Sequence, residues 1–201
     1  EIVYADERSG SQFKATGVNV VLSMANAQAP MDVKGSLIWN GERIDLLVFV
    51  KSPTQLATLG SPIDLASQSA NIIAALSGLA RLGDGLNLAG SLDVSAPDLR
   101  KLAQWAGVRI DGAAGLKQFS AKAGIDLAGQ TVKLNKATVA MDGMNAQGNV
   151  VLALAGNRPS LSASLGLDRL DTNIYTGKQA SAAGNGQSDW SDDPIDFSSL
   201  N

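Results

Sequence analysis

The sequence predicts a mainly β protein: a long, curved antiparallel sheet, a meander of groove- or taco-like shape, with one short amphipathic helix at about residues 97–106. Apolar and polar residues alternate with a period of two through most of the 201 residues, as in strands with one apolar and one polar face. Turn signals recur roughly every 10 to 14 residues, which is typical of a meander. Hydrophobic residues make up 45% of the chain and aromatic residues only 4%, so we expect an aliphatic sheet.

The stretch from Gly85 to Gly107 contains a strand followed directly by the helix. In the strand, one face is formed by Leu86, Leu88, Gly90, Leu92 and Val94. After Pro97 the period changes, and apolar residues recur at helical spacing at Leu99, Leu102, Ala103 and Ala106. Pro97 suits the first helical position, Asp98 suits the positive helix end, and Gly107 suits the residue just past the last turn.

The N-terminal half contains a predicted hairpin at Asn40-Gly41. Asn-Gly between two alternating runs favours a tight turn because both residues tolerate positive φ. The runs are residues 33–39 and 44–50; residues 18–24 alternate before them, and residues 1–12 are expected to form a turn or a short edge strand. Residues 72–80 fit either a helix or a strand, and we interpret them as a strand because of the single glycines nearby.

The C-terminal half predicts four more strands, at residues 119–127, 132–141, 150–154 and 161–167. Val132 and Leu134 alternate on one parity and Val139 and Met141 on the other, so we expect a β-bulge near Asn135 to Ala137.

The expected domain organisation is one elongated β domain at residues 1–176, followed by a flexible Ser/Gly-rich loop at 177–193. Residues 194–201 are expected to begin a further strand unit, because Pro194 to Ser199 echoes Pro62 to Ser67. The chain begins at Glu1 without a signal-peptide pattern, so we expect a fragment of a longer protein whose targeting segment lies outside it.

The composition excludes several classes of function. The chain has no His and no Cys, which removes the commonest general base, metal ligands and thiol nucleophiles. Its net charge is −3 and its 16 Lys and Arg are scattered, so we expect no nucleic-acid partner. No apolar run is long enough for a membrane-spanning helix. We also expect no metal and no cofactor.

Three groups of residues are candidates for chemistry, and none forms a recognisable catalytic motif. Ser11 and Lys14 match a Ser-x-x-Lys pattern, but the motifs that accompany it in enzymes are missing. Asp168 and Asp171 are a carboxylate pair that we interpret as a solvated strand end. The densest acidic cluster lacks the spacing of a calcium loop; its members are Asp189, Asp192, Asp193 and Asp196. We therefore expect no enzyme activity.

The apolar face is the feature that most needs an explanation, because a sheet must cover such a face with a second layer or with a ligand. The pattern leaves two interpretations open: a closed core, or a groove whose aliphatic lining suits acyl chains. Under the second interpretation, the candidate lipid-lining residues are Leu86, Leu88, Leu92, Val94, Leu161, Leu165 and Leu167.

Three stretches of the chain resemble the bacterial AsmA family. They are GSLIWNGERIDLLVFVKSP with GDGLNLAGSLDVSAPDLRKLAQWAG (within Val33 to Gly107), VAMDGMNAQGNVVLALAGNRPSLSASLGLDRLDTNIY (Val139 to Tyr175) and WSDDPIDFSSL (Trp190 to Leu200). The most specific pieces are Trp105-Ala106-Gly107, Asp142-Gly143 followed by Ala146-Gln147-Gly148, and Leu167-Asp168-Arg169-Leu170-Asp171. The resemblance does not extend to the membrane anchor of the family, which we expect to lie outside this sequence. The Ser/Gly-rich loop at 177–193 is also longer than the tight connection that the resemblance implies at this place.

The resemblance implies a non-catalytic periplasmic domain, tethered to the inner membrane by an N-terminal helix outside this sequence. It implies a role in outer-membrane biogenesis, in which a β-groove holds or conveys phospholipid acyl chains. The alternative is a structural module that docks envelope assembly factors through its sheet edges or its C-terminal tail.

Overall fold

The computed structural model describes residues 2–6, 11–108, 110, 115–154 and 160–169, and describes side chains from residue 14 onward. Its elements are the strands β1 (Ile2–Asp6), β2 (Ser11–Ser23), β3 (Met31–Trp39), β4 (Glu42–Val50), β5 (Ser61–Gln68), β6 (Ile73–Arg81), β7 (Asn87–Ala96), β8 (Phe119–Ala128), β9 (Thr131–Met141), β10 (Met144–Ala153) and β11 (Ser160–Leu167), with the 3-10 turn η1 (Pro53–Gln55) and the helix α1 (Leu99–Trp105).

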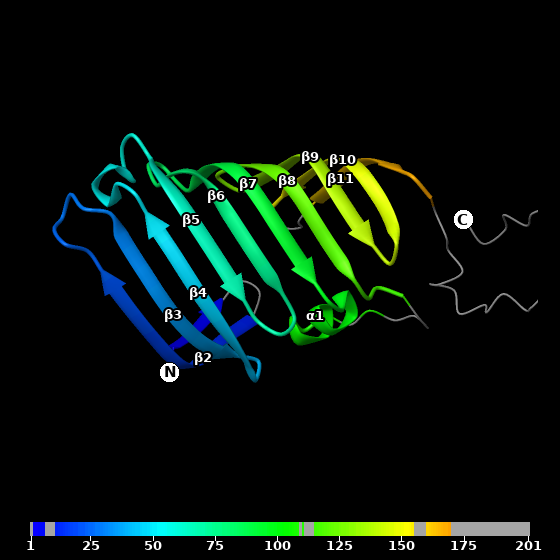
Figure 1. Cartoon of the computed structure of the whole chain (residues 1–201), viewed down its shortest axis with the longest axis horizontal. Coiled ribbons are helices and arrows are strands. Elements are labelled where there is room, and N and C mark those ends of the chain that lie inside the picture. The colour runs from blue at the N-terminus through cyan, green and yellow to red at the C-terminus, as the bar shows by residue number, and fades with distance from the viewer. Residues whose placement is uncertain (1, 7–10, 109, 111–114, 155–159, 170–201) are drawn as a thin grey trace, which may run out of the picture.

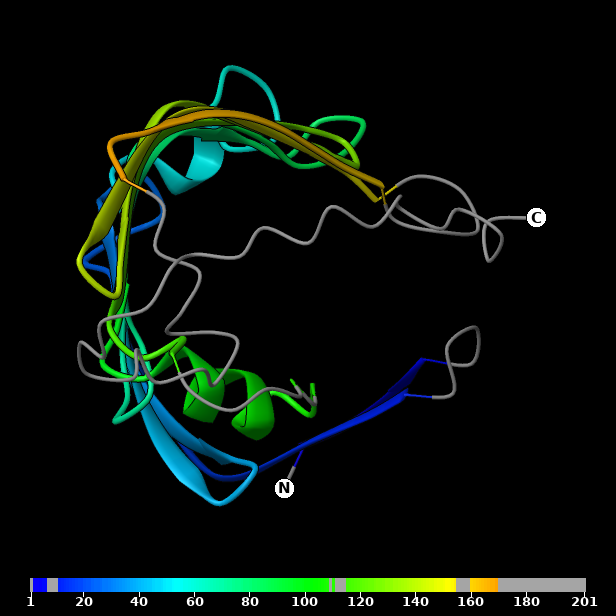
Figure 2. The same ribbon diagram turned by 90° about the vertical axis from the view of Figure 1, so that its right-hand side faces the viewer.

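The strands form a single open antiparallel sheet. Its eleven strands follow one another in chain order from β1 to β11, and each pairs with its sequence neighbours (Figure 1). Seen along the direction in which the strands succeed one another, the sheet bends into an arc with a concave and a convex side (Figure 2). The predicted fold class is therefore confirmed, and the ambiguous residues 72–80 lie in β6.

The helix α1 lies on the concave side of the sheet (Figure 2). The Trp105 ring of α1 stands edge-on to the Trp39 ring of β3, with 4.5 Å between ring centroids. Trp39 shares its strand face with Leu37 and Val33. The apolar face of the alternating strands is thus the concave face.

Two glycines of the concave face lie where neighbouring strands approach closely. Gly78 of β6 pairs with Gly90 of β7. A Cβ atom built on Gly90 would lie 2.7 Å from the Cα of Gly78 and would collide with the carbonyl oxygen of Ser77. Only glycine permits this close approach of two backbones, so a larger residue at Gly90 would push β6 and β7 apart.

The predicted tight turn at Asn40-Gly41 and the predicted bulge are confirmed. Asn40 and Gly41 have φ of 45° and 78°, as a tight hairpin turn requires. In β9 the register slips by one residue between Leu134 and Ala137, and Lys136 at the slip has a φ of 49°. The side chain of Asn149 accepts a hydrogen bond from the Lys136 amide at 3.0 Å, which stabilises the bulge.

Two local features differ from the prediction. Helix α1 begins at Leu99, because the side chain of Asp98 accepts a hydrogen bond from the Lys101 amide and caps the helix. Pro97 therefore precedes the cap and is not the first helical residue, while Gly107 follows the last turn with a φ of 84°. A second bulge, around Gly17 in β2, was not predicted.

Two predictions fall outside the described residues. They are the Ser/Gly-rich loop at 177–193 and the strand unit at 194–201. The described strands fit one elongated β unit up to Leu167.

Candidate functional site: the concave apolar face

The concave side carries four rows of directly paired residues, which we call the concave apolar face. Each row runs across the sheet, perpendicular to the strands. The first is Ser61, Ala80, Leu88, Leu127, Val132, Leu152 and Leu161; the second is Met31, Val50, Ile63, Gly78, Gly90, Ile125, Leu134, Val150 and Ala163. The third is Leu22, Val33, Val48, Leu65, Leu76, Leu92 and Ala123; the fourth is Val20, Gly35, Leu46, Ser67, Ala74, Val94, Ala121, Val139, Ala146 and Leu167.

The concave apolar face carries no charged residue, and its only polar side chains are those of Ser61 and Ser67. The hydroxyl of Ser61 accepts a hydrogen bond from the Ser52 amide at 2.8 Å. It also lies 3.1 Å from the carbonyl oxygen of Pro62, to which it donates. This buried hydroxyl therefore makes its hydrogen bonds to the turn after β4 and to the next residue of β5, and it presents no free polar group to the concave side.

The concave apolar face is only partly covered. Few apolar residues of the described chain are buried: Ala15, Val50, Ala80, Leu88, Ala96, Ala137 and Met144. Leu65, Leu76 and Leu92, in the middle of the sheet, are half-buried. Within the described residues no second sheet lies over them. The curvature makes neighbouring side chains converge, and this convergence rather than a second layer reduces their exposure.

Six of the seven residues predicted to line a groove lie on the concave side of the sheet, and all of these except Leu165 belong to the four rows. Leu88, Leu92 and Val94 lie on β7, and the others on β11. A single row joins Leu88 to Leu161 across the three intervening strands. Leu165 faces the same side, opposite Gly148 of β10. Leu86 is the exception, since it precedes β7 in a turn and is 44% exposed.

The prediction missed the residues between β7 and β11 and those of β4 to β6. Leu65, Leu76, Ile125 and Leu134 continue the same rows. The signal for them was present, since these residues alternate with polar neighbours as those of β7 do. The alternation within each strand does not predict the register between neighbouring strands, and this register joins the residues into rows.

Helix α1 is fastened to the β3–β4 hairpin, at one end of the strands. The indole nitrogen of Trp105 donates a hydrogen bond to the carbonyl oxygen of Trp39 at 3.1 Å. The side-chain amide of Asn40 donates to the carbonyl oxygen of Trp105 at 2.7 Å. The contact spans more than sixty residues of sequence, so it ties the helix after β7 to a distant part of the sheet.

The start of α1 is fastened to the β9–β10 turn through an intermediate segment. The Asp142 carboxylate accepts hydrogen bonds from the amides of Leu116 and Lys117, at 2.6 and 2.9 Å. The carbonyl oxygens of the same two residues accept from the amides of Arg100 and Leu99. Helix α1 is therefore held at both of its ends over one margin of the concave apolar face.

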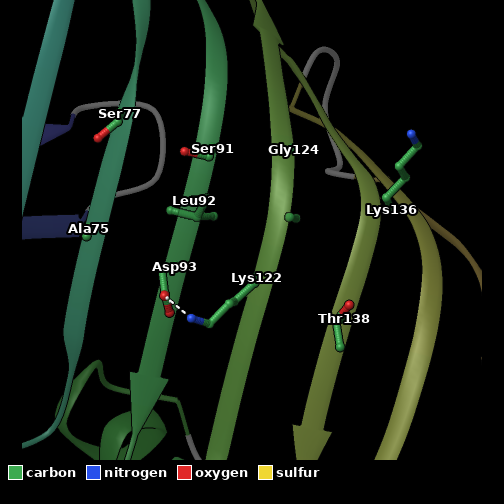
Figure 3. A pocket seen from close by; sticks show the side chains of 10 residues that line it. Ala75, Ser77, Ser91, Leu92, Asp93, Lys122, Gly124, Lys136 and Thr138 are labelled. Carbon is green, nitrogen blue, oxygen red and sulfur yellow. Dashed lines mark ion pairs between the residues drawn. The ribbon is translucent and has the colours of Figure 1, made fainter.

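The convex face is mixed: it carries paired charges and also exposed apolar side chains such as those of Leu47 and Ile73. Lys122 and Asp93, directly opposite each other on β8 and β7, form an ion pair of 2.8 Å. They border an open hollow of about 420 Å³ together with Ser77, Ser91 and Lys136 (Figure 3). The hydrogen bond from Lys122 to Asp93 raises the pKa of the lysine. Both charges are solvated, so the pair is a surface contact of small energy.

The carboxylates considered for chemistry have structural contacts where they are described. Asp168 follows β11 and accepts hydrogen bonds from the backbone and side-chain amides of Asn145, both at 2.9 Å. These bonds lower the pKa of the Asp168 carboxyl. Asp171 and the Asp189–Asp196 cluster lie outside the described residues, as does the side chain of Ser11. The described part of the chain holds no group of three potential metal-binding side chains.

Comparisons with known proteins give no relative for this chain. No protein-family model, curated protein or solved structure matches it. Among the described residues, no helix has the length and apolar character needed to cross a bilayer.

Proposed function

We propose that this chain is a non-catalytic periplasmic domain, tethered to the inner membrane in the full-length protein, that takes part in outer-membrane biogenesis. Its concave apolar face holds or conveys the acyl chains of phospholipids, as its resemblance to the AsmA family implies. The ligand is a phospholipid or another envelope lipid, and no cofactor is needed.

The observation that carries the proposal is the uncharged, aliphatic concave face, whose central side chains are only half-buried in the part of the chain that the structure describes. Contiguous exposed apolar surface of this kind marks binding sites in soluble proteins. Aliphatic side chains such as those of Leu76 and Leu92 pack against hydrocarbon and have no polar group that would need a hydrogen-bond partner. The sheet supplies two hydroxyl groups and no charge along the rows, which suits a saturated chain better than a polar ligand.

The dimensions of the concave face also fit an acyl chain. Neighbouring strands lie about 4.8 Å apart, so the second row, which crosses the nine strands from β3 to β11, is about 38 Å long. One leaflet of a bilayer has a hydrocarbon thickness of about 15 Å, half of the hydrocarbon core. An acyl chain that lies along a row therefore contacts several strands over its whole length.

The test places a photo-crosslinking amino acid at adjacent residues on opposite faces. Leu76 and Leu92 are paired on the concave side, and Ser77 and Ser91 are paired on the convex side of the same two strands. We expect phospholipid adducts, detected by mass spectrometry of the intact protein, at the two leucine positions and none at the two serine positions. Each serine lies one residue from a leucine on the same strand and differs from it in the face that it occupies. The serine positions are therefore matched controls.

Two outcomes would contradict the proposal. One is a wild-type protein that carries no lipid after purification in native mass spectrometry and takes none from phospholipid vesicles. The other is equal crosslinking at the concave and convex positions, which would mean that lipid adheres without using the concave apolar face.

A second candidate is the docking of envelope assembly factors through a sheet edge. It is favoured by β11, whose residues are all exposed and which pairs only with β10 among the described strands. An unpaired edge of this kind can accept a strand from a partner. This candidate is the one left if the concave face proves to carry no lipid.

A further inference from the structure

The two ends of the strands differ in character. Because the sheet is a meander, alternate turns lie at the same end of it. We call one end the apolar end; its turns comprise residues 24–30, 51–60, 82–86, 129–130 and 154. The other is the α1 end; it comprises residues 40–41, 69–72, 97–108, 110, 115–118, 142–143 and 168–169. Figure 1 shows the apolar end along the upper edge and α1 at the lower edge.

Charge is concentrated at the α1 end. Its described residues include seven charged ones: Asp98, Arg100, Lys101, Lys117, Asp142, Asp168 and Arg169. The described residues of the apolar end include two, Lys51 and Asp84. These two charges have opposite signs, so the described part of the apolar end is electrically neutral.

Large apolar side chains project from several turns of the apolar end. Leu59 is 77% exposed, Leu82 51% and Leu154 48%. Met24 and Leu86 are exposed at 42% and 44%. At the α1 end, Val108 is the comparable residue among those described. Single exposed apolar residues are common on protein surfaces, but here they recur at one end of the sheet on separate turns.

The turns of the apolar end are ordered by the backbone and not by burial of these side chains. The amide of Leu82 donates a hydrogen bond of 2.7 Å to the carbonyl oxygen of Leu56, which joins the turns 51–60 and 82–86. The amide of Gly60 donates to the carbonyl oxygen of Gln55 at 2.8 Å. The exposed leucines are thus held outward on fixed turns, and their own packing does not explain them.

We propose that the apolar end of the sheet inserts into the interface of a lipid bilayer. The turns that carry the exposed residues extend from the β2–β3 turn to the end of β10, about eight strand spacings or roughly 38 Å. Isolated side chains spread over such a distance need no matching pockets when the partner is a fluid surface. An end with only two charged side chains among its described residues has few charges to dehydrate when it enters the headgroup region.

The position of α1 supports the same orientation. Helix α1 lies over the concave apolar face at the opposite end (Figure 2), so the margin of this face next to the bilayer is the one without α1. The first row of the concave face, which contains Leu88 and Leu127, lies next to the apolar end. This inference rests on the proposed function in one respect, namely that acyl chains then pass between the bilayer and that row.

The test is vesicle flotation of the whole chain with two matched double variants. Leu82→Ser/Leu86→Ser changes the apolar end, where the two side chains are 51% and 44% exposed. Leu47→Ser/Ile73→Ser changes the convex face, where they are 52% and 50% exposed. We expect the first variant to lose about tenfold in partitioning onto phosphatidylcholine vesicles. We expect the second to partition as the wild type does.

A second measurement avoids any dependence on stability. The chain has no cysteine, so one cysteine introduced at Leu86 or at Leu47 carries an environment-sensitive fluorophore at that position alone. Added vesicles should shift the emission of the label at residue 86 to shorter wavelength and leave the label at residue 47 unchanged. Anionic phosphatidylglycerol in the vesicles, or added salt, should change neither result because the described apolar end is neutral.

Several outcomes would overturn the inference. They are a wild-type chain that does not float, equal loss in the two double variants, and binding that requires anionic lipid. A dimer seen by analytical ultracentrifugation without vesicles, and broken by Leu82→Ser/Leu86→Ser, would show that a second copy covers this end instead.

The two proposals fail in separate experiments. Loss of flotation with intact crosslinking of lipid at Leu76 and Leu92 would overturn membrane docking and leave lipid holding in place. Flotation without any lipid crosslinked at the concave positions would do the reverse.

Discussion

The concave and convex faces of the sheet are made by the same strands and differ in their charge and in the exposure of their side chains. Leu76 and Leu92 face the concave side and are half-buried. Their neighbours in sequence, Ser77 in β6 and Ser91 in β7, face the convex side and are exposed. Side chains on the inside of a bend converge and cover one another, whereas those on the outside spread apart. Curvature thus gives a single-layer sheet part of the burial that other folds obtain from a second layer.

The largest difference between the faces is expected for glycine substitutions. Gly90 lies on the concave side, where an added Cβ would meet the backbone of β6, with the Cα of Gly78 at 2.7 Å. We expect Gly90→Ala to lower the free energy of unfolding by about 3 kcal/mol, because neither backbone can move without opening the sheet. Urea unfolding followed by circular dichroism measures this change.

Gly124 is the matched control on the neighbouring strand. It lies on the convex side, and a Cβ there would approach nothing closer than 3.5 Å. Gly124→Ala should therefore leave stability unchanged or raise it by about 0.5 kcal/mol, through the lower entropy of the unfolded chain. Equal effects of the two substitutions would show that the close approach of β6 and β7 does not require glycine.

The next largest effect is expected at the contact between α1 and the concave side. Trp105→Ala removes the ring contact with Trp39 and the 3.1 Å hydrogen bond to its carbonyl oxygen. For this half-buried ring we expect a loss of about 2 kcal/mol in the free energy of unfolding, measured in urea.

Trp105→Phe separates the two parts of that contact. It keeps an aromatic ring against Trp39 and removes only the N–H donor, so the expected loss is about 1 kcal/mol. A Trp105→Ala variant as stable as the wild type would mean that α1 rests on the sheet without stabilising it.

The alternation of apolar and polar residues predicted the strands well because it involves only consecutive residues of the sequence. Asn40-Gly41 predicted a tight turn, and the change of parity between Leu134 and Val139 predicted a bulge that the structure has at Lys136. These features depend on neighbours within a few residues, and the chemistry of those residues decides them.

Contacts between distant parts of the chain could not be predicted from the sequence. The docking of Trp105 against Trp39 and the pairing of Gly78 with Gly90 depend on register and curvature, which no single strand encodes. Leu86 was misplaced for a related reason. Its spacing continues that of β7, but the first pairing of the strand forms at Asn87, which leaves Leu86 in the turn.

A smaller effect is expected at Asp142, which holds the segment before β8 to the β9–β10 turn. Asp142→Asn keeps a side chain that tolerates the φ of 50° at this position but leaves one acceptor oxygen for the amides of Leu116 and Lys117. We expect a loss of about 1 kcal/mol. Hydrogen exchange should quicken at these two amides, and unchanged protection there would show that the carboxylate does not hold the segment.

The smallest expected effect concerns pH. The concave apolar face has no titratable group, so acid should act through the convex face and the strand ends. Hydrogen bonds from Asn145 hold the pKa of the Asp168 carboxyl below its ordinary value. A carboxyl with a lowered pKa in the folded state stabilises that state above its unfolded pKa, and this contribution disappears as the pH falls through the folded pKa. As the pH falls below about 4 and through the folded pKa of Asp168, we therefore expect amide protection to fall at β10–β11 and to stay constant around Leu76 and Leu92. In Asp168→Asn the protection of β10–β11 should no longer depend on pH, whereas an unchanged dependence in this variant would assign the effect to another carboxylate.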